Sequence, residues 1–270
     1  MRRGRRPGDF PKPLHKGITS ARSPGGEKRK RTADLRRVAL SQLRIVHEDR
    51  DIVVIDKPAG LLAVPIPGSR VENARDLLAR HLALRRQKVF TVHRIDRYTS
   101  GLMVFAKHRK VHAHLVKQFL AHTPQRHYLA LVRGQPDPPE GELRHYLKLT
   151  THGFRQVVVR DEKAGGRLAV CRYRVLEAAG GISLVEVELV TGLKNQIRVQ
   201  LADAGTPVVG DRHYVEEERH TPGIDRQALH AARLRFIHPA TGHPMEFTAE
   251  LPPDLARLLE SFRRGKTSPG

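Results

Sequence analysis

The chain has 270 residues, which is long enough for one large domain or two small ones with hydrophobic cores of their own. Lysine and arginine number 49 against 28 aspartate and glutamate, and the resulting formal charge of +21 is typical of proteins that bind polyanions, nucleic acids first among them. The single cysteine, Cys171, excludes an internal disulfide framework and agrees with a reducing compartment, so we expect a cytoplasmic protein. No apolar run approaches the roughly 20 residues of a membrane helix, so we expect that the protein does not enter a membrane.

The N-terminal segment, residues 1–35, is basic and rich in proline, glycine and serine. The first 40 residues contain 13 Lys or Arg and 3 Asp or Glu, and they offer too few apolar side chains to offset the entropy lost on ordering. We therefore expect a flexible basic arm over 1–35, a folded domain over 36–264 and a disordered tail over 265–270. The arm either keeps the protein soluble or adds non-specific phosphate contacts. A mitochondrial transit peptide would also be rich in arginine, but the prolines and glycines disfavour the amphipathic helix that it needs.

From residue 43 the sequence changes to short apolar runs separated by polar turns, which indicates folded structure. The spacing of apolar residues predicts helices over 74–86, 109–122, 193–204 and 253–264. Strands are predicted over 43–49, 51–58, 126–133, 143–149, 155–160, 168–177, 183–190, 229–237 and 245–250. Because the strands come in consecutive groups and the helices are irregularly spaced, this order favours an α+β fold with a mixed sheet over a regular βαβ winding.

The segment 92–110, VHRIDRYTSGLMVFAKHRK, carries the most informative chemistry. Asp96 lies between Arg94 and Arg97 and precedes an expected turn over 98–101, which a short apolar strand follows. A carboxylate flanked by cations stays ionised, and one on a turn at a strand edge can project into a cleft, as a nucleophile or general base must. A surface salt-bridge cluster that caps a turn has the same composition. Composition alone leaves both interpretations open.

The string HRIDRYTSGL at 93–102 resembles the catalytic motif of the RluA-type pseudouridine synthases, H-R-L-D-x-x-T-S-G-L, with isoleucine in place of the leucine. Four further stretches match this family in the same order: 48–65 (EDRDIVVIDKPAGLLAVP), 127–134 (HYLALVRG), 191–214 (TGLKNQIRVQLADAGTPVVGDRHY) and 229–247 (LHAARLRFIHPATGHPMEF). Five ordered matches are far more specific than one motif. The resemblance implies the pseudouridine synthase fold, a mixed and largely antiparallel central sheet with flanking helices and a catalytic cleft across the sheet.

The resemblance also implies an isomerase that converts a uridine within RNA to pseudouridine, with no metal and no other cofactor. The reaction breaks the bond from C1′ to N1, turns the uracil and rejoins it through C5. Asp96 matches the essential aspartate of the family, which either attacks C1′ or assists deprotonation at the sugar. Arg198 matches the arginine that holds this aspartate. Tyr128 matches the tyrosine that stacks on the base and whose hydroxyl can take part in proton transfer at C5.

Four more residues are expected to bind the substrate. Arg94 resembles the family arginine that displaces the target nucleotide from the RNA stack, and Ile197 is expected to form an apolar wall near the uracil. Lys194 and Gln196 belong to the string that in most of the family is T-G-R-x-H-Q-I-R. This chain departs from that string with leucine at 193 and asparagine at 195. The loss of the arginine at 193 weakens the expectation of a phosphate or orienting contact at the start of the helix, although Lys194 keeps one positive charge nearby.

Ordinary structural roles compete with these assignments. Tyr128 lies in a strand-like run, where an aromatic residue commonly packs in the core. Lys194 and Arg198 are four residues apart on one predicted helix, so they could form a solvated or phosphate-binding basic face. Ile197 has an equally good reason to be apolar in the packing of its own helix. The order of the motifs favours the catalytic interpretation.

The expected substrate is ribosomal or transfer RNA, and the motifs name neither the RNA nor the position. We expect a monomer with no obligatory protein partner.

A non-catalytic RNA-binding or ribosome-assembly relative of the same fold is one alternative, which the intact set Asp96, Tyr128 and Arg198 disfavours. A metal-dependent nuclease is another, which the lack of a clustered carboxylate pair in the sequence disfavours. His112 and His114, two positions apart on a predicted helix, do not share a face, so no metal site is expected.

Overall fold

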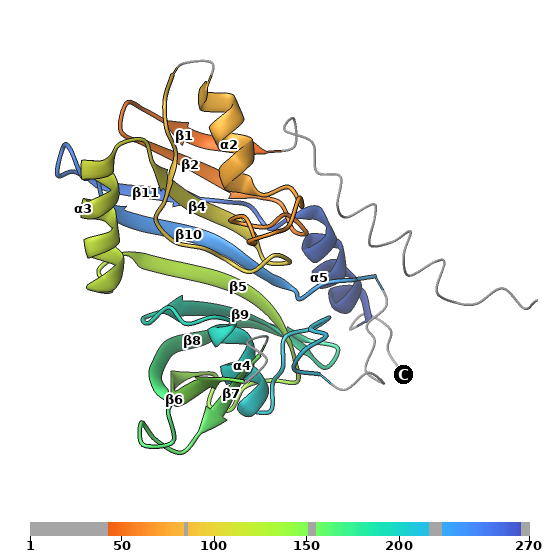
Figure 1. Ribbon diagram of the computed structural model, residues 1–270. Helices are drawn as coiled ribbons and strands as arrows, with labels where there is room; N and C mark the ends of the chain where they lie inside the picture. Colours follow the sequence, from red (N-terminus) through yellow and green to blue (C-terminus); the bar gives the residue numbers. More distant parts are fainter. Residues whose placement is uncertain (1–42, 84–85, 151–154, 216–222, 266–270) are drawn as a thin grey trace, which may run out of the picture. The chain divides into compact units, whose positions relative to one another are not determined.

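The computed structural model of the chain describes residues 43–83, 86–150, 155–215 and 223–265, all within one structural unit, Leu35–Gly270 (Figure 1). The helices are α2 (Ala74–Ala83), α3 (Arg109–Leu120), α4 (Gln196–Asp203) and α5 (Pro253–Gly265). The strands are β1 (Arg44–Glu48), β2 (Ile52–Lys57), β3 (Phe90–Thr91), β4 (Ser100–Ala106), β5 (Gln125–Arg133), β6 (Glu140–Leu149), β7 (Gln156–Val159), β8 (Arg167–Ala179), β9 (Ile182–Leu189), β10 (Leu229–Ile237) and β11 (Pro244–Thr248). The expected arm, 1–35, lies outside the described residues, as does the expected tail apart from Gly265 at the end of α5.

The described strands form one eleven-stranded sheet in the order β1-β2-β4-β10-β5-β9-β8-β6-β7, with β11 paired to β10 and β3 paired to β4. Among these described pairs, β4 and β10 alone run parallel, through the pairs Ser100–His230 and Gly101–Ala231. The predicted α+β fold with a mixed, largely antiparallel sheet is confirmed. No helix in the described part of the chain has the length and apolar character needed to cross a membrane.

The central strands are buried on both faces. Along β2, Ile52 and Val54 belong to a core that includes residues of α3, whereas Val53 and Ile55 belong to a larger core that includes residues of α2. Every residue of the neighbouring β4 is buried. Because helices cover both faces, these strands appear in the sequence as continuous apolar runs rather than as alternating patterns.

The start of β4 meets β10 at a very close approach. A β-carbon on Gly101 would lie 2.3 Å from the carbonyl oxygen of Ala231, and the φ of Gly101 is +114°, so only glycine fits here. Next to it, the Ser100 hydroxyl hydrogen-bonds Nδ1 of His230 at 2.9 Å. The expected turn over 98–101 is therefore too long: Ser100 and Gly101 are already part of β4, because pairing with β10 extends the strand.

Candidate active site

A cavity of about 480 Å³ is bordered by the loop before β4, by β5 and by the start of α4. Six of the seven residues expected at the site line this cavity: Arg94, Asp96, Tyr128, Gln196, Ile197 and Arg198. The seventh, Lys194, lines a second hollow that adjoins the first. The volume is in the range of small-molecule sites, and the fold thus brings together residues that are more than a hundred positions apart.

Arg198 holds Asp96 from 102 positions further along the chain. Its Nη1 donates to Oδ2 of Asp96 at 3.0 Å, while its Nε and Nη2 donate to the two carboxylate oxygens of Asp211 at 2.5 and 2.8 Å. The side chains of Asp211 and Arg198 are 0% and 6% exposed, against 21% for Asp96. Arg198 engages Oδ2 of Asp96, and among the described residues Oδ1 accepts no side-chain hydrogen bond, so one oxygen of the catalytic candidate is held and the other is not.

The two carboxylates keep the buried guanidinium charged. Burial alone would lower the pKa of Arg198, but the hydrogen bonds and charges of Asp211 and then of Asp96 raise it above its ordinary value. The sequence placed Arg94 and Arg97 beside Asp96 as its cationic neighbours. Within the described residues, the ion pair of Asp96 is instead with Arg198, while Arg94 is exposed and Nε of Arg97 donates to the carbonyl of Gly60 at 2.8 Å.

Asn195, one of the two departures from the family string, shapes the chain before α4. It adopts a left-handed conformation with φ +53°, so α4 begins at Gln196, three residues later than expected. Lys194 therefore lies outside α4 and is exposed, whereas Arg198 is buried, and the expectation of a shared basic helix face is wrong. Oδ1 of Asn195 accepts from Nη1 of Arg198 at 3.2 Å, and its Nδ2 donates to the Tyr214 hydroxyl at 3.3 Å. The asparagine thus helps to hold the arginine.

Gln196 fastens the same turn to the sheet. Its Oε1 accepts from the Thr191 hydroxyl at 2.8 Å and from the backbone N–H of Leu193 at 3.0 Å, and its Nε2 donates to the carbonyl of Val170 at 3.1 Å. Gln196 is buried and both ends of its amide are engaged internally, which suits a positioning role. The next residue, Ile197, lines the cavity and also packs in the larger core, so both of its expected roles agree with the geometry.

Tyr128 lies on β5, opposite Val187 of β9 and Ala231 of β10. It is almost completely buried and lines the cavity. Burial raises the pKa of its hydroxyl; Arg126 opposes this shift and Asp96 adds to it. The phenol therefore stays protonated at neutral pH, and it offers an aromatic face together with a hydroxyl donor beside the carboxylate.

Lys57, which the sequence analysis treated only as part of a strand end, anchors the loop that carries Asp96. It is fully buried, and its Nζ donates to the backbone carbonyls of Pro58, Leu61 and Arg97 at 2.9, 2.9 and 3.0 Å. The backbone N–H of Gly60 also donates to the carbonyl of Arg97, at 2.9 Å. Burial lowers the pKa of Lys57 to about 7. A lysine that closes an apolar strand was the signal in the sequence that could have identified this role.

A wall of the cavity is built from residues that sequence reasoning assigned no role. Nε2 of His93 accepts from the backbone N–H of Val104 at 3.1 Å, and its ring stacks on Phe119 with 4.5 Å between centroids. Burial, with the charge of Arg126, lowers the pKa of His93 to about 3, so the ring is neutral. Arg126 itself donates to the backbone carbonyls of 189–191 at 3.0 to 3.2 Å. These contacts fasten His93 and Nη2 of Arg126 to the backbone of neighbouring strands.

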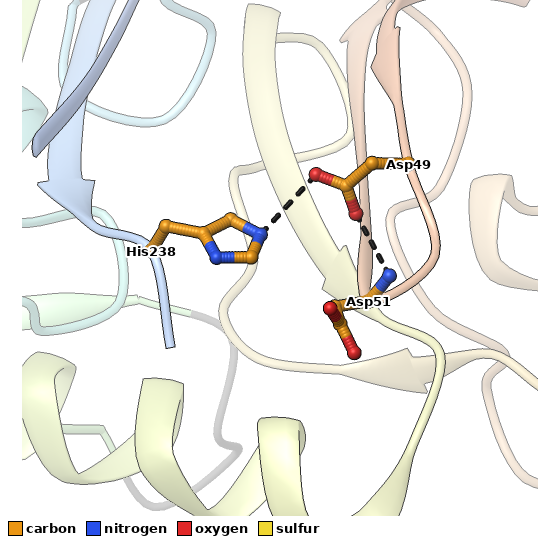
Figure 2. Close-up of side chains that lie close together, drawn as sticks. All are labelled: Asp49, Asp51 and His238. Carbon is orange, nitrogen blue, oxygen red and sulfur yellow. Dashed lines mark hydrogen bonds and ion pairs between the residues drawn. The ribbon is translucent and has the colours of Figure 1, made fainter. Parts of the chain in front are cut away.

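One cluster in the described part of the chain has the residue types of a metal site: Asp49, Asp51 and His238 (Figure 2). Nδ1 of His238 accepts from the backbone N–H groups of Ala240 and Thr241 at 3.3 and 3.1 Å, so its proton is on Nε2, which donates to Asp49 at 3.2 Å. A metal would need the lone pair of that nitrogen. The carboxylate of Asp49 also accepts from the backbone N–H of Asp51 at 2.8 Å. The cluster thus ties the β1–β2 turn to the end of β10, and we assign it a structural role.

Comparison with known proteins adds independent information. The model of the family described as RNA pseudouridylate synthase matches residues 51–203. The chain is 34% identical to the ribosomal large subunit pseudouridine synthase D of Zymomonas mobilis, over 81% of this chain and 72% of that protein. It is 36% identical to the protein of the same name from Pseudomonas aeruginosa, over 83% and 73% of the two chains. It is 42% identical to an uncharacterised RNA pseudouridine synthase of Chloroflexus aurantiacus, over 77% and 66%.

A solved structure agrees at the level of the fold. Human RNA pseudouridylate synthase domain containing 4 superposes with a TM-score of 0.69, and the match covers 87% of this chain and 98% of that one. The sequence identity is 23%, so this likeness shows the fold alone.

Proposed function

Since the chain belongs to the RNA pseudouridylate synthase family, as an RluA-type member, we propose that Asp96 is its catalytic carboxylate. The protein is an RNA pseudouridine synthase, an isomerase whose substrate is RNA. One observation carries the assignment of Asp96: Asp96, Tyr128 and Arg198 come from three distant parts of the sequence and line the same cavity.

The carboxylate is proposed to act through its Oδ1. The reaction breaks the bond from C1′ to N1 and joins C1′ to C5 of the same base. C5 releases its proton and N1 takes up one, so the product is an isomer of the substrate. Because Arg198 holds Oδ2, Oδ1 is the oxygen that either attacks C1′ or takes a proton from the sugar. Arg198 is itself locked on Asp211. The carboxylate of Asp96 is thus held in a fixed orientation through Oδ2, and a group that is already oriented toward its target reacts faster than a mobile one.

The remaining residues are proposed to hold the base and the RNA. Tyr128 stacks on the detached uracil and presents its protonated hydroxyl near C5, while Ile197 forms an apolar wall. Arg94, exposed at the rim, takes the place of the flipped nucleotide in the RNA stack. Lys194, exposed on the adjoining hollow, contacts a phosphate. Gln196 acts indirectly, by fixing the turn before α4.

We further propose large-subunit ribosomal RNA as the substrate, with transfer RNA as the alternative. Two of the similar proteins carry ribosomal large subunit in their names, and this supports the choice. A monomer is proposed as the active form. A cytoplasmic location is proposed because the one cysteine of the sequence, Cys171, is a buried free thiol.

The test is pseudouridine mapping of total RNA from cells that lack the gene, complemented by wild type or by Asp96→Asn. We expect one or a few uridines of the large-subunit RNA to lose modification and to be restored by wild type alone. Asparagine keeps the shape of the side chain and an oxygen for Arg198, so a thermal scan should show a folded variant. Restoration by Asp96→Asn would refute the role of Asp96. Loss confined to transfer RNA would overturn the choice of RNA and leave the enzyme assignment standing.

A further inference from the structure

The hollow beside the catalytic cavity has a volume of about 460 Å³. The two spaces share three lining residues, Arg167, Gly192 and Leu193, so they form one continuous surface. The other walls of the hollow are Leu147, Lys148, Leu149, Gln156, Gly165 and Lys194, which come mainly from β6, β7 and the turns beside them. An RNA strand whose uridine occupies the first cavity can therefore continue directly into the second.

The lining combines positive charge with exposed apolar surface. Lys148, Arg167 and Lys194 are basic, and none of the described lining residues is acidic. Leu149 is 45% exposed although its side chain is large and apolar. Unpaired nucleotides are recognised by this combination, because cations contact the phosphates while apolar or aromatic side chains cover the faces of the bases.

Gln156 adds a polar group that the protein itself leaves unused. The residue is 8% exposed, and within the described residues its amide oxygen Oε1 is buried without a hydrogen-bond partner. Its backbone, in contrast, is satisfied by Tyr214, whose hydroxyl accepts from the N–H at 3.0 Å and donates to the carbonyl at 3.2 Å. A buried acceptor without a donor costs free energy. Because Gln156 lines the hollow, rotation of its side-chain amide toward that space would let a ligand donate to Oε1 and recover the cost.

We propose that this hollow binds the nucleotide next to the target uridine, with an N–H of its base donating to Oε1 of Gln156 and its face against Leu149. The proposal rests on the proposed function, because the target uridine must occupy the cavity of Asp96. Every nucleobase carries an N–H donor on its Watson–Crick edge, and pairing would consume it. The substrate segment is therefore unpaired over at least two adjacent nucleotides, and the enzyme recognises both.

The experiment compares two fluorescein-labelled RNA decamers built from abasic residues, one with a single uridine and one with two adjacent uridines. Fluorescence anisotropy gives the affinity of each for wild type, Gln156→Leu and Gln87→Leu. Gln87 is the matched control, because its Oε1 is also buried without a partner among the described residues but the residue lines neither space. Leucine at 156 leaves the backbone contacts with Tyr214 in place, and a thermal scan of each variant reports its folding.

For wild type we expect the second uridine to improve affinity about tenfold. About twofold of this gain arises because either uridine can enter the cavity of Asp96, and the rest comes from the hydrogen bond and apolar contact of the base in the hollow. In Gln156→Leu the gain should fall by about 3- to 5-fold, as expected for one lost hydrogen bond, and in Gln87→Leu it should persist. An undiminished gain in a folded Gln156→Leu, or an equal loss in Gln87→Leu, overturns the proposal. Pseudouridine formation is read separately, so an intact gain without pseudouridine in any RNA would refute the proposed function alone.

Discussion

Replacement of Arg198 by lysine tests whether the fork on Asp211 is what orients Asp96. The guanidinium makes four side-chain hydrogen bonds: two to Asp211, one to Asp96 and one to Asn195. A lysine ammonium is a single point on a flexible stem and cannot reproduce the fork. Two charge-assisted bonds are lost at about 1.5–3 kcal/mol each, so the free energy of unfolding should fall by about 3–6 kcal/mol.

The loss should be visible in both folding and turnover. A decrease of that size corresponds to a melting temperature lower by roughly 10 °C for a domain of this length. Displacement of the carboxylate by about 1 Å should lower kcat by about 100-fold. Urea unfolding gives the first quantity, and the release of tritium from RNA labelled at uridine C5 gives the second.

Arg263→Lys is the matched control. Arg263 also forms a fork, on Glu177 at 2.7 to 3.1 Å, but the pair is on the surface, with the two side chains 50% and 31% exposed. Because solvent screens this exposed pair, the same substitution there should leave both the free energy of unfolding and the turnover close to those of wild type. If Arg198→Lys kept kcat within about threefold of wild type, the inference that Arg198 orients Asp96 would be wrong, because the effect expected from misplacement is about 100-fold.

Two further predictions concern the supports of the site. Gly101→Ala should abolish folding, because its β-carbon would lie 2.3 Å from the Ala231 carbonyl oxygen. The control Gly68→Ala, where φ is also positive but the space is open, should lower the free energy of unfolding by only about 1–2 kcal/mol. Soluble yield and thermal scans measure both effects, and a stable Gly101→Ala variant would refute the close approach of β4 and β10. Burial lowers the pKa of Lys57 to about 7 from an ordinary 10.5, so between these values the unfolded chain binds more protons and stability rises with pH. Lys57→Met should lack this rise when urea unfolding is compared at about pH 7 and about pH 9, and an equal rise in both proteins would contradict the burial of a titrating lysine.

Local patterns in the sequence were sufficient for most of the fold. The apolar run of β2 and the helical spacing in α2 and α3 identified elements whose bounds in the structure differ by no more than three residues, and β4 was expected as a short apolar strand after the turn, without bounds. The exception among the strands is β3, Phe90–Thr91, which is too short to form a pattern. Helix α4 begins late because Asn195 is left-handed, and single-residue backbone conformations of this kind leave no periodic signal.

The partners of the site residues were the part that local reasoning could not supply. The sequence suggested Arg94 and Arg97 as the cations beside Asp96 because they are neighbours in the chain, but the ion pair comes from Arg198, 102 positions away. Asp211 lies inside a stretch that matched the family, yet nothing local indicates that its carboxylate holds a buried arginine. Such pairings are set by the topology of the sheet, so they become visible only when the strands are placed.

The parallel contact between β4 and β10 explains why the loop of Asp96 is so firmly held. Parallel strands begin at the same edge of a sheet, so the segments that enter β4 and β10 lie side by side there (Figure 1). From the segment before β10, Arg226 donates to the carbonyl of Tyr98 at 3.3 Å, and Nε2 of Gln227 donates to the Thr99 hydroxyl at 3.2 Å.

Arg226 is in turn fixed by Asp254 at the start of α5, through bonds of 2.7 and 2.9 Å. From the side of β2, Lys57 and the turn that follows it hold the carbonyl of Arg97. The loop of Asp96 is therefore anchored from two strands and a helix in the protein alone. Because the site is assembled before RNA arrives, the binding free energy of the RNA is available to extract the uridine from its stack, which is the costly step for an enzyme that acts on a flipped base.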